Sequence, residues 1–420
     1  MGRVLTLLEH GMLPVDGDGG ITSTQLDHLC RMQDRLDTRV VTEVRRGGRW
    51  MIKASSLVGT VFLHGGDVLE ILPKTDKETS GGEVRTNLAH MVARSGLVPS
   101  LEDGFGPLAS DRDLISAFLL HVAGRIFRLV HKGMPREYVR RAMVSGFIKG
   151  RLDVRLQVAR RTNRHDSHHL VCDELTHDTY NNRLLKSCLP AMTMASRSDR
   201  ARNMFRSLAG LMEGVGGMPV ENRAFDRLRF DRRNAAWQPV FELLRLFVRD
   251  LMPSPRAGDR SRGPAWLFDM NSLFEAYVGA MMRRLYGSRV VLQGPRRFFL
   301  CCMDSGKHWQ AMKPDVTLLD DHRPLVMLDT KWKLLGDDIR DDVSAADLRQ
   351  VYTYARIYGA DAGVLVYPTV SDVPRQAHLR TEEGQPVLVH IVEVPVSRGR
   401  LGEMAGILRM NNILQTVEVA

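Results

Sequence analysis

Two aspartates and a lysine stand beside two short apolar segments in the last third of the chain. Asp315 precedes residues 316–319, whereas Asp329 follows residues 325–328 and is itself followed, two residues later, by Lys331. Ionised carboxylates only accept hydrogen bonds, and they suit a hard cation such as Mg2+ that keeps several of its waters. An ammonium group beside a metal-bound water can orient that water and stabilise charge on phosphate oxygens. These residue types therefore predict metal-dependent hydrolysis of a phosphodiester.

The two apolar segments also predict how these side chains come together. Residues 320–324 carry turn signals, so the segments on either side are expected to be buried strands of one hairpin. In a strand, Lys331 lies on the same face as Asp329, and the carbonyl of Thr330 between them would add a metal ligand. The alternative is a surface hairpin in which Asp329 and Lys331 form an exposed ion pair. Burial of the strand favours the metal site, because an unpaired charge is costly to desolvate.

A predicted helix upstream of the hairpin, residues 271–286, places Glu275 within an otherwise apolar face. A carboxylate among apolar side chains needs a partner. Glu275 would serve either as a third metal ligand or as a bracket for Lys331. An ordinary helical pair with Arg283 or Arg284 explains its position equally well.

A second predicted helix follows Ser344, whose hydroxyl is a typical N-cap. Gln350 and Tyr354 are four residues apart and so share one face of this helix. They would reach phosphate or brace Lys331, unless they form only the polar edge of an amphipathic helix. Residues 363–368 predict a further strand, and the order of strand, strand, helix and strand is typical of an α/β layer with the site at a sheet edge.

This order of helix, hairpin, Asp-x-Lys and second helix resembles the PD-(D/E)xK nuclease superfamily. More narrowly, the chain resembles the McrC family, the nuclease subunits of McrBC modification-dependent restriction systems. The narrower resemblance rests on five further segments, residues 58–61, 69–74, 136–138, 148–152 and 178–186. Two departures are Lys149, where the family more often has arginine, and residues 255–263, which look like an insertion.

The resemblance implies a fold, an activity and a site. The fold would be multidomain α+β and would end in an α/β PD-(D/E)xK nuclease domain with a mixed central sheet. The activity would be Mg2+-dependent endonucleolytic cleavage of double-stranded DNA. The metal ligands would be Asp315, Asp329 and Thr330, and the catalytic set would be Asp315, Asp329, Lys331, Glu275, Gln350 and Tyr354.

The chain has no G-x-x-x-x-G-K-[ST] segment, so it should not hydrolyse a nucleoside triphosphate by itself. The resemblance implies a separate hexameric AAA+ GTPase of the McrB type, which binds the GTP, recognises methylated DNA and translocates it. This chain would dock through its N-terminal region and stimulate that partner, with Lys74 and the turns at 47–48 and 65–67 as exposed candidates. The alternatives are a non-catalytic adaptor between an NTPase ring and DNA, and a nuclease that acts alone on RNA or branched DNA.

Composition favours a polyanionic partner. The 420 residues carry a formal net charge of +10 and a pI near 9.6, and 44% of them are hydrophobic, which is ample for the cores of two or three domains. Five cysteines without a CxxC pair favour a reducing, cytoplasmic compartment, and the sequence has no continuous apolar run of membrane-spanning length. The arginines that would contact phosphate cluster at Arg197, Arg200, Arg202, Arg206, Arg223, Arg227, Arg229, Arg232 and Arg233.

Periodicity and linker composition divide the chain into three expected domains. Residues 1–82 predict a β-rich, partner-binding domain, residues 83–253 a mainly helical middle domain with the arginine cluster, and residues 264–420 the nuclease domain. Within the middle domain, residues 165–169 together with Cys172 and His177 carry zinc-ligand types. Their spacing matches none of the usual structural zinc sites, so a solvated loop is expected there.

Overall fold

The computed structural model describes residues 2–36, 38–74, 80–98, 100–101, 113–159, 166–251, 265–295, 298–301, 303, 307–380 and 387–409. The chain divides into two compact units. The first combines Met1–Phe118 with Pro253–Ala420, and the second is Leu119–Met252. The first unit thus joins the two ends of the chain, whereas the ranges expected from the sequence follow one another.

A four-stranded sheet near the N-terminus contains one strand from far along the chain. Its order is β1-β6-β5-β10, with β1 parallel to β6 and the other pairs antiparallel. These strands are β1 (Val4–Leu8), β5 (Leu57–Phe62), β6 (Val68–Leu72) and β10 (Ala265–Asp269). A second sheet of β2 (Met12–Pro14), β4 (Arg49–Ala54) and β3 (Val41–Arg46), together with α1 (Ser23–Leu36), shares the same hydrophobic core. The C-terminal part of the first unit therefore begins inside the N-terminal sheet.

Gly59 allows β10 to lie beside β5. Its φ angle is +134°, and a Cβ atom at this position would lie 2.0 Å from the carbonyl oxygen of Trp266. Only a residue without a side chain tolerates both this backbone conformation and this approach. Gly59, within the segment 58–61 noted in the sequence, is therefore needed where β5 pairs with β10.

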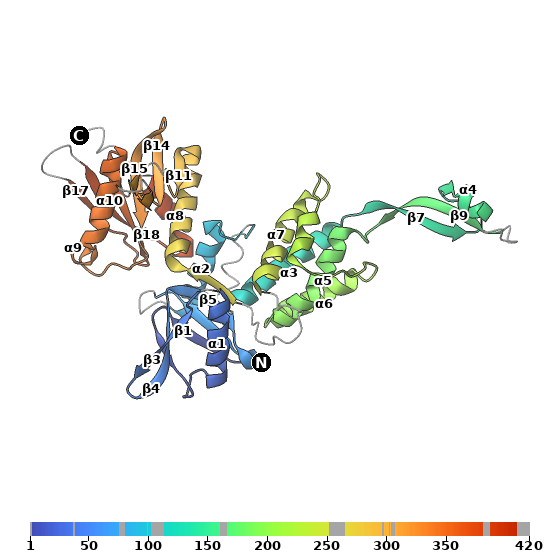
Figure 1. Ribbon diagram of the computed structural model, residues 1–420, viewed down its shortest axis with the longest axis horizontal. Coiled ribbons are helices and arrows are strands. Elements are labelled where there is room, and N and C mark those ends of the chain that lie inside the picture. Colours follow the sequence, from blue (N-terminus) through green and yellow to red (C-terminus); the bar gives the residue numbers. More distant parts are fainter. Residues whose placement is uncertain are drawn as a thin grey trace. The chain divides into compact units, whose positions relative to one another are not determined.

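A six-stranded mixed sheet forms the centre of the C-terminal part (Figure 1). β14 and β15 are an antiparallel hairpin, and β15, β16 and β18 run parallel to one another. In spatial order the strands are β11 (Val290–Leu292), β14 (Val316–Asp320), β15 (Arg323–Thr330), β16 (Ala362–Thr369), β18 (Leu388–Pro395) and β17 (Gln376–Arg380). The fold is thus mixed α+β with several sheets, and the expected mixed sheet near the C-terminus is confirmed.

Helices of the first unit pack on this sheet and on each other. α10 (Ala345–Tyr358) packs against β15 and β16, whereas α8 (Met270–Tyr286) contacts β15 and α11 (Leu401–Leu408) contacts β18. α2 (Gly81–Ser95) begins with a capping box between Ser80 and Glu83 and packs against α8. α2 therefore lies in the first unit, although most of its residues fall within the range 83–253. Shorter elements of this unit are α9 (Ile339–Asp342), β12 (Phe299–Cys301) and β13 (His308–Ala311).

The second unit is a helical body with an arm built on a three-stranded sheet (Figure 1). In the body, α5 (Tyr180–Ala195) packs against α6 (Asp199–Leu211) and α7 (Gln238–Leu246). α3 (Leu114–Lys132) begins in the first unit and continues into the second. By length and composition α3 is apolar enough to cross a membrane, but 61% of that apolar window is buried inside the protein, as in the core helix of a folded unit.

The arm consists of β7 (Glu137–Ser145) paired antiparallel with β9 (His168–Thr176), with β8 (Arg151–Leu152) on the other side of β9 and α4 (Val154–Ala159) beside it. The sequence predicted a mainly helical domain here, with a loop over residues 165–169. That was wrong for His168 and His169, which begin β9; His165 lies outside the described residues. Most side chains of β7 are exposed, so the apolar and polar alternation that marks a half-buried strand is missing.

Candidate active site

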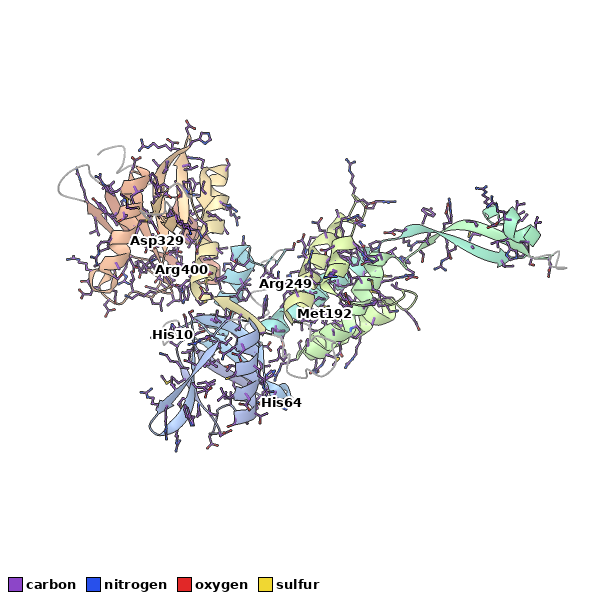
Figure 2. The ribbon with its side chains drawn as sticks, viewed as in Figure 1. His10, His64, Met192, Arg249, Asp329 and Arg400 are labelled. Atoms are coloured by element: carbon purple, nitrogen blue, oxygen red, sulfur yellow. The ribbon has the colours of Figure 1, made fainter. Side chains whose placement is uncertain are left out.

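The β14–β15 hairpin brings Asp315 and Asp329 to the same end of the central sheet. Val316 pairs with Leu328, so the residue before β14 lies beside the end of β15. Asp315 Oδ2 accepts hydrogen bonds of 2.8 Å from both the backbone N–H and the hydroxyl of Thr330. Asp329, marked in Figure 2, is only 2% exposed. Thr330, the residue after Asp329, thus holds the Asp315 carboxylate close to Asp329.

Lys331 lies between these carboxylates and α10. Its Nζ is 2.7 Å from Asp329 Oδ2 and donates a 3.1 Å hydrogen bond to Gln350 Oε1. Gln350 Nε2 in turn donates to the Tyr354 hydroxyl at 3.0 Å. The structure therefore joins four of the residues singled out in the sequence in one chain of contacts. The ion pair is not the exposed surface pair considered as the alternative, because its carboxylate is buried.

Asp347 is a neighbour that the sequence analysis did not single out. Its Oδ1 lies 3.8 Å from Lys331 Nζ, and its Oδ2 accepts a hydrogen bond of 3.3 Å from the Tyr367 hydroxyl. Asp347 precedes Gln350 by three residues and so shares its face of α10. That spacing was the available signal, but a first-turn aspartate is also explained by the positive end of the helix.

Glu275 faces the same carboxylates from α8. Burial raises the pKa of Glu275 to about 7, and the negative charges of Asp315 and Asp329 add to the rise, which Lys313 partly opposes. Within the described part of the chain, no ion pair joins Glu275 to Arg283 or Arg284. The helical pair considered from the sequence is therefore not formed.

The pKa of Asp329 is also raised. Burial raises the pKa of Asp329 to about 6, and the charge of Asp315 raises it further although Lys331 lowers it. Burial lowers the pKa of Lys331, but the hydrogen bond and charge of Asp329 together with the charges of Asp347 and Asp315 outweigh burial, so the net shift is upward and the amine stays protonated. Carboxylates that raise one another's pKa despite a neighbouring ammonium form a site that can accept further positive charge.

The donor chemistry fits a magnesium ion. Magnesium is bound by one or two carboxylates and otherwise by water, so it does not need an all-protein cage. The described residues contain no group of three or more His, Cys, Asp or Glu side chains placed to hold a metal by themselves. The side chains of His168, His169, Cys172 and His177, in and after β9, likewise form no such metal-binding group.

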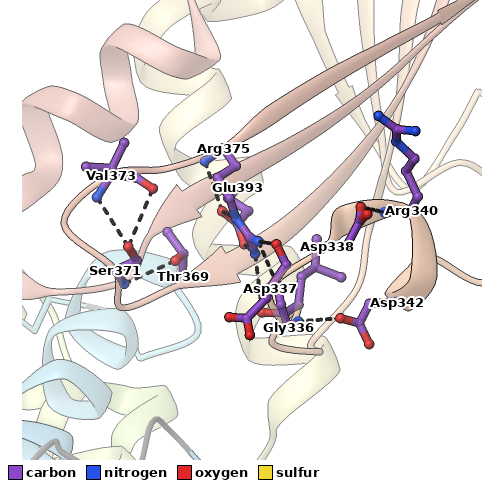
Figure 3. Close-up of polar contacts among 11 residues, drawn as sticks. Gly336, Asp337, Asp338, Arg340, Asp342, Thr369, Ser371, Val373, Arg375 and Glu393 are labelled. Carbon is purple, nitrogen blue, oxygen red and sulfur yellow. Dashed lines mark hydrogen bonds and ion pairs between the residues drawn. The ribbon is translucent and has the colours of Figure 1, made fainter.

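A half-buried arginine, Arg375, fixes the loop that follows β15 (Figure 3). Arg375 donates from Nε to Glu393 Oε2 at 2.9 Å and from Nη2 to Glu393 Oε1 at 2.7 Å. The same guanidinium donates to the carbonyls of Gly336 at 2.6 Å, Asp337 at 2.8 Å and Leu335 at 3.3 Å. Sequence analysis missed this pair, although a glutamate inside the wholly buried strand β18 signals that a cation must lie against it.

Part of the arginine cluster is neutralised by neighbouring acids. Arg233 lies 2.9 Å from Asp231, and Arg202 forms an ion pair with Asp199 one helical turn away. The remaining arginines of the cluster stay candidates for phosphate contact.

The chain is similar to proteins of known family and known structure. The family model "McrBC 5-methylcytosine restriction system component" matches residues 52–368. No curated protein matches the chain. The chain resembles a structure of a tetradecameric assembly of Thermococcus gammatolerans McrB AAA+ hexamers with bound McrC, with a TM-score of 0.75 and 21% identity over 98% of this chain and 100% of that chain. A cryo-EM structure of the Thermococcus gammatolerans McrBC complex gives a TM-score of 0.53 and 21% identity over 67% of this chain and 88% of that chain. The fold is therefore McrC-like, and because the family model covers most of its length, the chain belongs to the McrBC 5-methylcytosine restriction system component family.

Proposed function

We propose that this chain is the DNA endonuclease subunit of a McrBC-like restriction complex and cleaves double-stranded DNA by Mg2+-dependent phosphodiester hydrolysis. The observation that carries the proposal is the grouping of Asp315, Asp329 and Lys331 at one end of a mixed sheet. Membership of the McrBC family supports the proposal. The order of these residues along the chain, which resembles that of PD-(D/E)xK nucleases, supports it as well. The C-terminal part of the first unit would then be the nuclease domain.

Each side chain has a role that follows from its contacts. Asp315, Asp329 and the carbonyl of Thr330 would hold Mg2+, which supplies Lewis-acid stabilisation of charge on phosphorus-bound oxygens. The protonated Lys331 would orient the attacking water and stabilise the developing phosphate charge. Gln350 accepts from Lys331 Nζ and so fixes the direction of the ammonium. Two further residues support the site: Tyr354 braces Gln350, and Glu275 adds a third carboxylate.

The motor for this reaction would be a separate subunit. One similar solved structure contains McrB AAA+ hexamers with bound McrC and the other is of an McrBC complex, and we propose an equivalent hexameric AAA+ GTPase partner here. That partner would bind GTP and recognise methylated DNA, and the complex would act in the cytoplasm. The N-terminal sheets would dock on it, with Lys74 and the tight turns at Gly47 and Gly65 as the contacts that stimulate GTP hydrolysis.

The deciding experiment is cleavage of methylated and unmethylated plasmid by the chain co-purified with its AAA+ partner, with GTP and Mg2+. We expect cleavage of the methylated plasmid, and loss of that cleavage in Asp329→Ala. The matched control is Asp320→Asn, at the other end of the same hairpin, which should cleave normally.

Three outcomes would contradict the proposal. Full nicking by Asp329→Ala would remove the site assignment. Absence of cleavage by the wild-type complex would favour the non-catalytic adaptor. Cleavage by the isolated chain, without any NTPase, would favour a stand-alone nuclease.

A further inference from the structure

Two side-chain contacts join the N-terminal sheet to the two elements that carry the candidate active site. The indole Nε1 of Trp332, the residue after Lys331, donates a 3.1 Å hydrogen bond to Glu9 Oε2. The hydroxyl of Ser56 donates a 3.0 Å hydrogen bond to Asp269 Oδ2, at the start of α8. The first contact reaches the end of β15, and the second reaches the helix of Glu275.

Glu9 is held firmly by the sheet to which it belongs. It follows β1, is 5% exposed, and its backbone N–H donates to the carbonyl of Leu72 at the end of β6 at 2.8 Å. Burial raises the pKa of Glu9, whereas its hydrogen bonds with Trp332 and with the backbone of Lys74 lower it. His10, labelled in Figure 2, lies 3.5 Å away through Nε2. A carboxylate buried in this way needs specific donors, and Trp332 supplies one of them.

Trp332 connects this carboxylate to both sides of the site. Its ring packs against Phe274, the residue before Glu275, with ring centroids 5.6 Å apart. Just before it, the backbone N–H of Lys331 donates to the carbonyl of Val366 at 2.9 Å. The backbone that carries the Lys331 side chain is therefore fixed by β16 on one side and by the anchored indole on the other.

The start of α8 is anchored in a similar way. Asp269 caps the helix by accepting from the backbone N–H of Ser272 at 2.9 Å, and its other oxygen accepts from Ser56. The backbone N–H of Met270 also donates to the carbonyl of Ser56 at 3.2 Å. Glu275 lies less than two turns further along the helix, so its position depends on this anchor.

We propose that Glu9 is a positioning residue of the nuclease site, which acts by holding the Trp332 indole and thereby the backbone of Lys331. This inference rests on the proposed nuclease function and extends it, because every residue assigned to the site so far comes from the C-terminal part of the chain. Arg375 pins the loop after β15 at residues 335–337, so Glu9 supplies the anchor at its beginning. A partner that binds the N-terminal sheet would then change, through Glu9 and Trp332, the position of the Lys331 backbone.

The test uses the full chain with its co-purified AAA+ partner and compares Glu9→Ala, Trp332→Phe and the double variant. Each should lower kcat for DNA cleavage by about tenfold to a hundredfold with little change in KM, because a displacement of order 1 Å at a reacting group costs on this scale. The double variant should be no slower than either single variant, since both remove the same contact. Glu9→Gln keeps an oxygen acceptor for the indole and should restore most of the rate.

A second measurement does not depend on cleavage. Hydrogen exchange of peptides covering residues 329–334 should accelerate in Glu9→Ala, although these residues are far from residue 9 in the sequence. The matched control is Glu70→Gln, another buried carboxylate of the N-terminal sheet, which forms an ion pair with Arg85 at 2.7 Å and, among the described residues, makes no hydrogen bond or ion pair with the site. This control should lower the melting temperature and accelerate exchange around β6, but leave residues 329–334 protected.

Several results would overturn the positioning role. These are unchanged kcat and exchange in Glu9→Ala, additive losses in the double variant, or equal acceleration of residues 329–334 in Glu70→Gln. A wild-type complex that cleaves nothing would instead contradict the proposed function, and the exchange experiment would then still decide whether Glu9 holds the Lys331 segment.

Discussion

Lys331 Nζ lies 2.7 Å from Asp329 Oδ2, yet this ion pair leaves excess negative charge at the end of the central sheet. The pKa of Asp329 remains raised, to about 6, by burial and by Asp315. The pKa of Glu275 is raised to about 7 by burial and by both aspartates. One ammonium therefore does not offset the mutual repulsion of these carboxylates.

The first prediction concerns Lys331 itself. Lys331→Ala should lower the cleavage rate by about 100- to 1,000-fold, the usual cost of removing one group that stabilises transition-state charge. It should leave stimulation of the partner's GTP hydrolysis unchanged, because no described N-terminal contact involves the Lys331 side chain. Both rates are measured on one preparation of the complex. Equal loss of cleavage and GTPase stimulation would show that the variant is misfolded or that the two activities share this residue.

The second prediction is a pH dependence of stability that Mg2+ reverses. Glu275 and Asp329 have folded-state pKa values near 7 and 6, above those of ordinary unfolded carboxyls, so the folded chain binds protons more tightly. Their contribution to stability is fully present below the unfolded pKa and is lost as pH rises through about 6 to 7. The metal-free chain should therefore melt at a lower temperature at pH 8 than at pH 5.5, as far as these two groups are concerned. Added Mg2+ should stabilise the chain at pH 8 and much less at pH 5.5, because its ligands must be deprotonated.

Glu275→Gln provides the control for this pH dependence. The glutamine is neutral at every pH, so the decline in melting temperature between pH 5.5 and pH 8 should be smaller in this variant. An identical decline in the variant and the wild type would assign the effect to other groups. Thermal melts with and without Mg2+ in matched ionic strength make the comparison.

Short-range patterns made the centre of the site predictable. Asp315, Asp329 and Lys331 belong to one hairpin, and the spacing of two residues fixes which side chains share a face. Glu275 was noticeable because a charge within an apolar helix face needs a partner, and the structure places it near the two aspartates. Gln350 was found through helical spacing from Tyr354. Each of these inferences uses residues within a single hairpin or a single helix.

Contacts between distant segments were not predictable. The sequence around Glu9 or Trp332 does not indicate that these side chains meet, since each of them could form a hydrogen bond with many other groups. The pairing of β10 with β5 likewise joins residues about two hundred positions apart in sequence, and β10 is too short to be recognised by periodicity. The β7–β9 arm was not predicted for a different reason, because most side chains of β7 are exposed and show no apolar alternation.

The third prediction concerns the Arg375 clamp. Arg375→Ala removes the cation that neutralises Glu393, which is 1% exposed, and also frees the carbonyls of Leu335, Gly336 and Asp337. We expect a loss of about 2–3 kcal/mol in the free energy of unfolding, reduced from the usual cost of breaking a buried pair because Arg375 is partly exposed. Urea unfolding measures it. Arg375→Lys keeps the charge but not the five-donor fork, so it should recover only part of this loss.

The clamp should also show strong coupling. In the double variant Arg375→Met with Glu393→Met, no buried charge is left unpaired, so the loss should be smaller than the sum of the two single losses. Additive losses would mean that the two side chains do not stabilise each other, in spite of their 2.7 Å contact.

The last prediction concerns the strand that joins the two ends of the chain. Gly59→Ala places a Cβ atom 2.0 Å from the Trp266 carbonyl oxygen at a φ of +134°, so β10 must shift away from β5. Overpacking of this kind costs about 1–3 kcal/mol, and the unfavourable backbone adds to it. Gly210→Ala is the matched control, because a Cβ there meets nothing within 4 Å and the residue lies in α6, where alanine favours the helix by up to about 1 kcal/mol. Urea unfolding should therefore show opposite signs for the two substitutions, and a neutral Gly59→Ala would mean that β10 can separate from β5 without cost. Because β10 leads directly into the cap of α8 at Asp269, a displaced strand should also reduce cleavage, whereas Gly210→Ala should leave cleavage unchanged.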